Sequence, residues 1–254
     1  KDREAAVMRE TLIRLGIAAA VFVVLLFAFL VYVLLASSSP DYWAGEISEF
    51  ERLDVSNPPP KGGIVFVGGR DVRLWETLEE DMAPLPVLNR GFGGAYLDHL
   101  TYFAARIIKP YQPCAVVVIA GAEDMADVQG RTPEELLGGF KVFLSALRAH
   151  EVSAPVVFVS IRPSPMRAAR WFGAKRANGL IEAFAATRDG VIYLDVASLM
   201  FTDDEEMRDE IFRWDGLSLS PEGYSLLTSR LRPLLMRRFN APQPNPLEEP
   251  NGQF

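Results

Sequence analysis

The chain has 254 residues, of which 49% are hydrophobic and 23% charged, and its formal net charge at pH 7 is −7. This composition excludes a disordered chain, a polytopic membrane protein and a basic nucleic-acid-binding protein. The single cysteine, Cys114, excludes a disulfide within the chain.

Residues 15–36 form an uninterrupted apolar run in which Tyr32 is the only polar side chain. A helix of that length spans about 33 Å, enough to cross a hydrocarbon core of about 30 Å. Four basic residues precede the run and only Arg52 closely follows it. The positive-inside rule therefore predicts a single-pass protein with a cytoplasmic N-terminus and an extracytoplasmic domain, periplasmic in a bacterium. The alternative is a signal peptide cleaved near Ala36-Ser37-Ser38.

The rest of the chain alternates between helical patterns and short apolar runs. A helix with Trp43, Ile47 and Phe50 on one face is predicted before the Pro-Pro-Pro sequence at 58–60, with Ser39 as its N-cap. Two further helices begin at the capping box Thr132-Pro133-Glu134-Glu135 and at Ser220-Pro221. The apolar runs, predicted as strands, are residues 63–67, 87–89, 115–120, 156–160 and 191–194. Such an alternation is typical of a parallel sheet covered by helices on both faces.

The helix at Thr132 is expected to bury Leu136, Phe140, Phe143 and Leu147, and the helix at Ser220 to bury Tyr224, Leu227, Leu231 and Leu234. The predicted organisation is a cytoplasmic N-terminus (1–14), a transmembrane helix (15–36), a helix with a Pro-rich lead-in (37–62), an α/β domain (63–240) and a Pro-rich tail (241–254).

Four motifs follow the predicted strands or lie late in the chain, and ligand sites in parallel sheets lie at the carboxyl ends of strands. They are Val67-Gly68-Gly69-Arg70-Asp71, Asn89-Arg90-Gly91-Phe92-Gly93-Gly94, Ala120-Gly121-Ala122-Glu123-Asp124 and Trp214-Asp215-Gly216-Leu217-Ser218. With Arg162-Pro163-Ser164-Pro165, they resemble the SGNH (GDSL-type) esterases and lipases, in particular the platelet-activating-factor acetylhydrolase-like branch. The resemblance covers about residues 43–238. It implies a flavodoxin-like three-layer α/β/α sandwich with a five-stranded parallel sheet.

The resemblance also implies a catalytic arrangement, and this chain departs from it at most positions. Gly68, Gly91 and Gly94 match the family's turns, and Asp215 matches the residue that orients the catalytic base. Arg70 stands where the family has its Ser nucleophile, Glu123 where it has an oxyanion-hole Asn, and Ser218 where it has its His base.

Each substitution removes a chemical role. Arginine stays protonated and is no nucleophile, and a carboxylate repels an oxyanion that an amide would stabilise by about 3 kcal/mol. Serine cannot act as a base near neutral pH. Because Arg70 and Glu123 carry opposite charges, we expect Arg70, Glu123 and Asp215 to form an ion-pair network that fills the former site.

Other residues give weaker signals. His99 and His150 are expected to be structural helix residues, and Cys114 a core residue. A hard cation such as Ca²⁺ among Asp71, Glu123, Asp124 and Asp215 is disfavoured by Arg70 in their midst. The glycines at 91–94 lack the last glycine and the position of a dinucleotide loop.

The resulting hypothesis is a catalytically inactive, membrane-anchored relative of the family that serves as a structural or accessory subunit of an integral membrane complex on the extracytoplasmic face. Its expected partners are the bilayer and integral membrane proteins, contacted through the apolar helix, the membrane-proximal domain and the Pro-rich tail. No cofactor, metal ion or nucleic acid is expected. Two alternatives stay open: an extracytoplasmic module that binds acyl or glycan groups through Arg70 or Arg90, and an envelope ester hydrolase with relocated catalytic residues.

Overall fold

The computed structural model of the chain describes residues 2–126 and 130–239. It separates into two compact units, Lys1–Ala44 and Gly45–Phe254. The predicted tail, residues 241–254, lies outside the described residues.

The first unit is dominated by one long helix, α1 (Asp2–Ala36). Its stretch Met8–Val33 is long and apolar enough to cross a membrane or to serve as a signal anchor, and none of it is buried. Seven residues, 37–43, including a 3₁₀ turn at Pro40–Trp43, lead to α2 (Ala44–Ser56). Ser39 occupies the N-cap position of this 3₁₀ turn, as expected from the sequence, although its side chain makes no capping hydrogen bond there.

The second unit is built on a five-stranded parallel sheet in the order β2-β1-β3-β4-β5. The strands are β1 (Ile64–Gly68), β2 (Val87–Gly91), β3 (Ala115–Ile119), β4 (Val156–Val159) and β5 (Val191–Leu194). This strand order is that of a flavodoxin-like sheet. The predicted fold class is therefore confirmed. The second strand runs two residues further than expected and includes Arg90 and Gly91.

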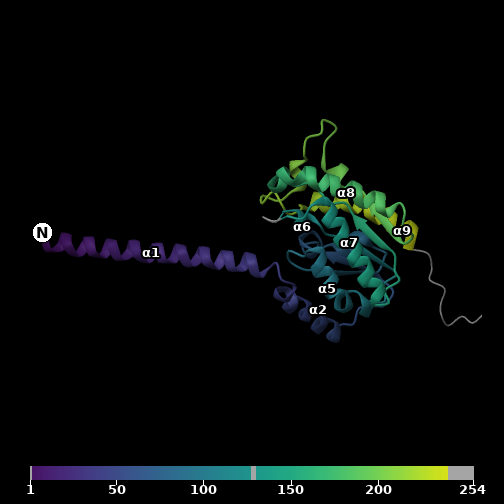
Figure 1. The fold of residues 1–254 in the computed structure, drawn as a ribbon, viewed down its shortest axis with the longest axis horizontal. Coiled ribbons are helices and arrows are strands. Elements are labelled where there is room, and N and C mark those ends of the chain that lie inside the picture. The colour runs from purple at the N-terminus through teal and green to yellow at the C-terminus, as the bar shows by residue number, and fades with distance from the viewer. Residues whose placement is uncertain (1, 127–129, 240–254) are drawn as a thin grey trace, which may run out of the picture. The chain divides into compact units, whose positions relative to one another are not determined.

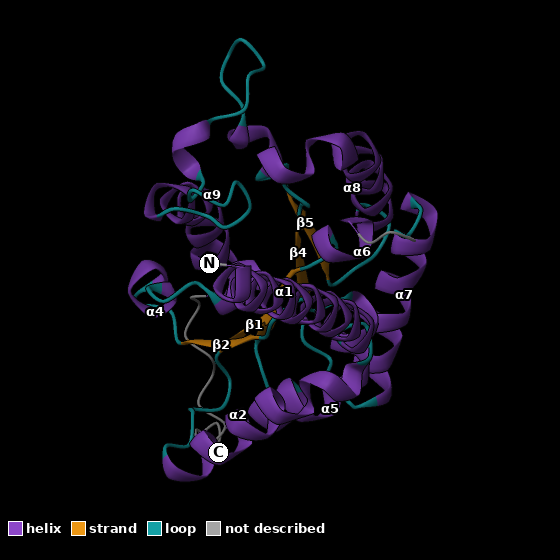
Figure 2. Ribbon diagram, turned by 90° about the vertical axis from the view of Figure 1, so that its left-hand side faces the viewer, coloured by secondary structure: helices purple, strands orange, loops and turns teal. Residues whose placement is uncertain are grey.

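Helices cover both faces of the sheet, with α4 and α9 on one side and α5, α7 and α8 on the other (Figure 2). The remaining elements follow in chain order along the ribbon of Figure 1. Their bounds are α3 (Arg70–Arg73), α4 (Leu78–Met82), α5 (Leu97–Ile107), α6 (Ala122–Ala126), α7 (Pro133–Ala149), α8 (Trp171–Ala185) and α9 (Pro221–Phe239).

Apart from β2, which contains Asn89 and Arg90, the strands are apolar throughout because alternate side chains enter two separate cores. Phe66, with its neighbours on the same sheet face, packs against Trp75 and the buried side of α9. On the opposite face, Phe158 contacts Phe140 of α7, with the ring centres 4.8 Å apart.

The helix α7 begins as the sequence predicts. Thr132 accepts the N–H of Glu135 through its hydroxyl, and the Glu135 carboxylate accepts the N–H of Thr132 at 2.8 Å. Helix α9 packs the expected Leu234 half-buried against the core, and it buries Leu235 completely.

Candidate active site

Three glycines shape the loops at the carboxyl end of the sheet. A Cβ atom on Gly68 would lie 2.1 Å from the carbonyl oxygen of Ile119, and one on Gly91 would lie 2.4 Å from the backbone nitrogen of Arg73. Gly94 has a φ of +56°, a conformation that other residues rarely adopt. A side chain at any of the three would therefore displace or strain the backbone around the site.

Arg70 begins α3, directly after the turn that ends β1. Its guanidinium Nη1 lies 3.5 Å from the Oγ of Ser218, and its buried Nε has no hydrogen-bond partner. Within the described part of the chain, no carboxylate pairs with Arg70 within 4.0 Å. Arg70 is therefore the least neutralised charge of the site.

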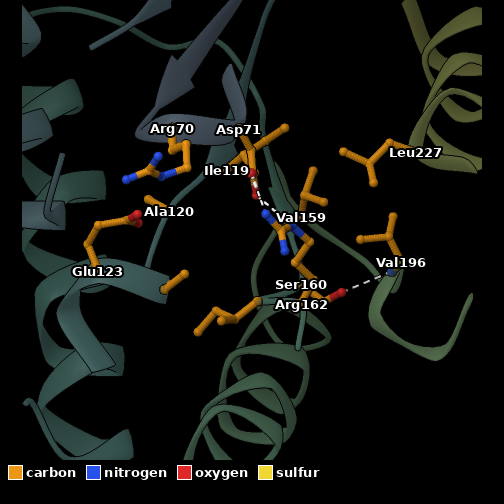
Figure 3. A pocket seen from close by; sticks show the side chains of 12 residues that line it. Arg70, Asp71, Ile119, Ala120, Glu123, Val159, Ser160, Arg162, Val196 and Leu227 are labelled. Atoms are coloured by element: carbon orange, nitrogen blue, oxygen red, sulfur yellow. Dashed lines mark hydrogen bonds and ion pairs between the residues drawn. The ribbon is translucent and has the colours of Figure 1, made fainter. Parts of the chain in front are cut away.

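Asp71 and Arg162 form the most buried ion pair of the site. Two guanidinium nitrogens of Arg162 donate to the two carboxylate oxygens of Asp71 at 2.6 and 2.8 Å. The side chain of Arg162 is 8% exposed and that of Asp71 is 13% exposed. Arg162 also donates to the carbonyl of Leu217 at 2.7 Å. The pair links the segments after β1 and β4 to the late loop that carries Asp215, and Figure 3 shows it in the middle of the site.

Glu123 lies in α6 and faces Arg167, with 3.5 Å between Nη1 and Oε1. Its neighbour Asp124 is buried and accepts the N–H of Leu97, at the start of α5, through both oxygens at 3.3 Å. Burial raises the pKa of Asp124 to about 7, partly offset by the attraction of Arg131.

Asp215 and Ser218 form a tight pair in the late loop. The hydroxyl of Ser218 donates to Asp215 at 2.7 Å, and the N–H groups of Leu217 and Ser218 donate to the other carboxylate oxygen at 2.9 and 2.8 Å. These hydrogen bonds, the Ser218 hydroxyl foremost, lower the pKa of Asp215 to about 2. Asp215 is therefore an ionised acceptor across the physiological pH range.

The free space at the centre of the site is small. A cavity of about 20 Å³ lies among twelve residues that include Arg70, Glu123, Ser160 and Arg162 (Figure 3). That volume holds about one water molecule. A larger ligand enters only when side chains such as Arg70 move.

The structure thus gathers the three positions at which the sequence departs from the family pattern, Arg70, Glu123 and Ser218, together with the matching Asp215. The expected ion-pair network among the first three is not formed, because Glu123 pairs with Arg167 and Asp215 is occupied by Ser218 and two backbone N–H groups. Arg70 affects Asp215 only through longer-range attraction.

The sequence did not single out Arg167, which lies in a 3₁₀ turn after β4. The sequence pointed to Arg162 only as part of the motif that carries the family resemblance. Both follow β4, so their position at the carboxyl end of a strand was the signal that could have placed them in the site.

The other residues that the sequence raised as candidates have structural roles. Arg90 is buried, pairs with Asp54 and donates to Tyr111 at 2.8 Å, so it holds α2 to the sheet and is not available to a ligand. His99 is buried in α5, and His150 ends α7. Among the described residues, no group of three His, Cys, Asp or Glu side chains is placed to hold a metal ion.

Comparisons with known proteins give a consistent picture. The profile of the GDSL-like Lipase/Acylhydrolase family matches residues 62–226. The Bos taurus platelet-activating factor acetylhydrolase IB subunit alpha1 is 28% identical over 200 residues, which are 74% of this chain and 82% of that protein. The Bos taurus isoamyl acetate-hydrolyzing esterase 1 homolog is 28% identical over 179 residues, 61% and 70% of the two chains.

Solved structures share the fold. A GDSL-like lipase from Bacteroides thetaiotaomicron VPI-5482 superposes with a TM-score of 0.64 at 17% identity, covering 75% of this chain and 97% of its own. The lipase/acylhydrolase from Enterococcus faecalis superposes with a TM-score of 0.57 at 18% identity, covering 72% and 100%.

The relatives named acetylhydrolase and esterase point to a hydrolase, and they overturn the expectation of a chain without catalytic activity. That expectation rested on the loss of the family's Ser, Asn and His at three positions, 70, 123 and 218. The loss removes one way of activating a nucleophile, but it does not exclude another hydroxyl at the same edge of the sheet.

Proposed function

This chain belongs to the GDSL-like lipase/acylhydrolase family, and we propose that it is a membrane-anchored ester hydrolase whose nucleophile is the hydroxyl of Ser218. One observation carries the proposal: that hydroxyl donates to the Asp215 carboxylate at 2.7 Å, with the Arg70 guanidinium 3.5 Å from the same oxygen. The hydroxyl can act as the nucleophile, the carboxylate as the proton acceptor and the cation as a stabiliser of the oxyanion, which are the three roles used in acyl transfer.

In the proposed reaction, Oγ of Ser218 attacks the carbonyl carbon of the ester while its proton passes to Asp215. The carbonyl oxygen becomes an oxyanion beside the Arg70 guanidinium. The bond to the alcohol oxygen then breaks, and the alcohol leaves with the proton from Asp215. Water attacks the acyl group on Ser218, a proton returns through Asp215 to Oγ, and the carboxylic acid departs.

Two features of the site set the expected rate. A carboxylate with a pKa of about 2 is a weaker base than histidine, so turnover slower than that of a Ser-His pair is expected. Ser218 is also only 2% exposed, so an ester reaches it after the Arg70 side chain has moved. The buried position keeps bulk water away from the reacting atoms.

The experiment is turnover of p-nitrophenyl acetate by the purified full chain, with Ser218→Ala and Asp215→Asn as test variants. Ser164→Ala is the matched control, because Ser164 is also buried and lines the same group of cavities. We expect activity in the wild type and the control and loss in both test variants. Turnover that survives Ser218→Ala would overturn the proposal.

A covalent probe gives a second readout that does not depend on the rate. A fluorophosphonate reacts with an activated serine, and peptide mass spectrometry identifies the modified residue. The proposal requires the adduct on Ser218. An adduct on Ser160 or Ser164, or none in a folded protein, would contradict it.

For the anchor, the proposed topology places residues 1–14 in the cytoplasm and the domain on the extracytoplasmic face. It is supported by the basic residues before the apolar stretch of α1. Protease digestion of sealed vesicles with the cytoplasmic face inward tests it, because only an extracytoplasmic domain is degraded.

Association with an integral membrane partner remains a prediction, which co-purification in mild detergent tests.

A further inference from the structure

Three of the most exposed large apolar side chains on the second unit come from neighbouring segments. Trp214 is 99% exposed, Phe172 is 83% exposed and Met166 is 70% exposed. Single exposed apolar residues are ordinary on a protein surface, but several large ones in one place mark an interaction site.

The three side chains come from two segments that are joined by a backbone hydrogen bond. The N–H of Met166 donates to the carbonyl of Gly216 at 3.0 Å, two residues after Trp214, and Pro165 lies against Gly216. Phe172 lies in the first turn of α8, directly after the 3₁₀ turn Pro165–Arg170. We call Met166, Phe172 and Trp214 the apolar rim.

The apolar rim adjoins the candidate active site. Arg167 stands one residue after Met166 and pairs with Glu123, and Asp215 directly follows Trp214. The rim therefore belongs to the same end of the sheet as the proposed nucleophile.

The segment that carries Met166 and Phe172 is basic, although the protein as a whole is acidic. Residues 152–181 contain five Arg or Lys residues and no Asp or Glu. Arg162, Arg167 and Arg176 pair with carboxylates from other segments. Arg170 and Lys175 are exposed, and neither has a carboxylate within 4.0 Å in the part of the chain that the structure describes.

We propose that the apolar rim docks on the phospholipid surface of the membrane that holds α1. Tryptophan and phenylalanine are enriched at the membrane interface, and Arg and Lys reach lipid phosphates from beside inserted apolar groups. Residues 37–43, which connect α1 to α2, span at most about 25 Å when extended. A domain on so short a connection stays close to the lipid surface, which makes that surface the occupant most available to the rim.

Site-directed spin labelling tests the docking on the full chain in nanodiscs of phosphatidylcholine and phosphatidylglycerol. In a Cys114→Ala background, Phe172→Cys and Trp214→Cys place labels on the rim. Val142→Cys is the control, since Val142 is 58% exposed on α7, which carries no residue of the rim. Collisions with oxygen report lipid, and collisions with a water-soluble nickel chelate report water.

We expect the rim labels to collide more often with oxygen and less often with the nickel chelate than the label at 142. Equal, water-like collision rates at all three positions would overturn the proposal. So would spin–spin broadening between rim labels, which would assign the rim to a second copy of the chain.

Together with the proposed hydrolase function, on which this step rests, the apolar rim indicates the substrate class. The substrate would be an ester of a lipid in the membrane on which the rim docks. Replacing the rim residues by Phe172→Glu and Trp214→Glu is expected to lower turnover of an ester embedded in the nanodisc at least tenfold. Turnover of soluble p-nitrophenyl acetate should stay unchanged. An equal effect on both esters would contradict the lipid substrate, whereas no turnover of either by the wild type would instead contradict the hydrolase.

Discussion

The guanidinium of Arg70 and the hydroxyl of Ser218 meet across the candidate active site, with 3.5 Å between Nη1 and Oγ, although 148 positions separate them in the chain. The same hydroxyl is bound to Asp215 on its other side. A fixed positive charge beside a hydroxyl favours the alkoxide-like character that a nucleophile develops, and it favours the oxyanion that follows.

Replacing this cation should therefore affect the chemical step more than substrate binding. We expect Arg70→Gln to lower kcat for ester hydrolysis about 100-fold, in line with the loss of one oxyanion donor, with a small change in KM. Arg176→Gln is the control, because Arg176 forms an exposed pair with Glu134 away from the site. An unchanged or increased kcat in Arg70→Gln would mean that Arg70 only blocks the site.

The identity of the base predicts the pH profile of hydrolysis. A histidine base makes the rate fall as the pH drops through about 6.5. Asp215 has a pKa of about 2 and stays ionised down to strongly acidic pH, chiefly because it accepts the Ser218 hydroxyl. We expect kcat/KM, measured from pH 5 to 8 with a correction for spontaneous hydrolysis, to be nearly constant. A limb with an apparent pKa near 6.5 would point to another group, such as His99, His150 or the buried Asp124, in place of Asp215.

Much of the fold followed from the sequence because it depends on local patterns. The all-apolar runs predicted the strands, and the Thr132 capping box predicted the start of α7. The rule that ligands bind at the carboxyl ends of parallel strands placed Arg70 and Glu123 at one edge of the sheet. These inferences need only the period and the order of the elements, whereas the placing of Ser218 in the same site came from the family resemblance.

The pairing of charges within the site did not follow from the sequence. A guanidinium on a long, flexible side chain can reach any of several carboxylates, and the choice is decided by the rotamers and by competing donors. Glu123 is paired by Arg167 and Asp71 by Arg162, both from the segment after β4. The backbone N–H groups that bind Asp215 are likewise visible only once the loop is folded.

Breaking the Asp71–Arg162 pair should destabilise the fold because both groups are largely buried. Removing one partner leaves the other charge buried and unpaired, which lowers the free energy of unfolding by about 3–5 kcal/mol. We expect Arg162→Met to lower the free energy of unfolding by that amount in urea titrations of the detergent-solubilised protein. The exposed Arg176→Met control should cost less than about 1 kcal/mol.

A double variant separates the stranded charge from other effects. Asp71→Asn together with Arg162→Met leaves no unpaired charge, so it should recover part of the stability lost in Arg162→Met alone. If the double variant lost more unfolding free energy than the two single variants lose together, packing rather than charge would dominate at this position.

Asp124 should make stability depend on pH. Its pKa is about 7 in the folded protein, mainly through burial, against a model-peptide value of 3.8. The folded state therefore binds this proton more tightly than the unfolded chain does. The stabilisation from the protonated carboxyl is complete below about pH 4, declines as the pH rises through about 7 and is absent above that, with a slope of at most about 1.4 kcal/mol per pH unit.

The Asp124→Asn variant isolates this contribution, because asparagine can still accept the Leu97 N–H but does not ionise. We expect the difference in unfolding free energy, wild type minus variant, to fall between pH 4.5 and 7 and then to level off. Groups common to both proteins cancel in that difference. A constant difference over the whole range would show that Asp124 keeps the same charge throughout, with Arg131, 3.6 Å away, offsetting the cost of burial.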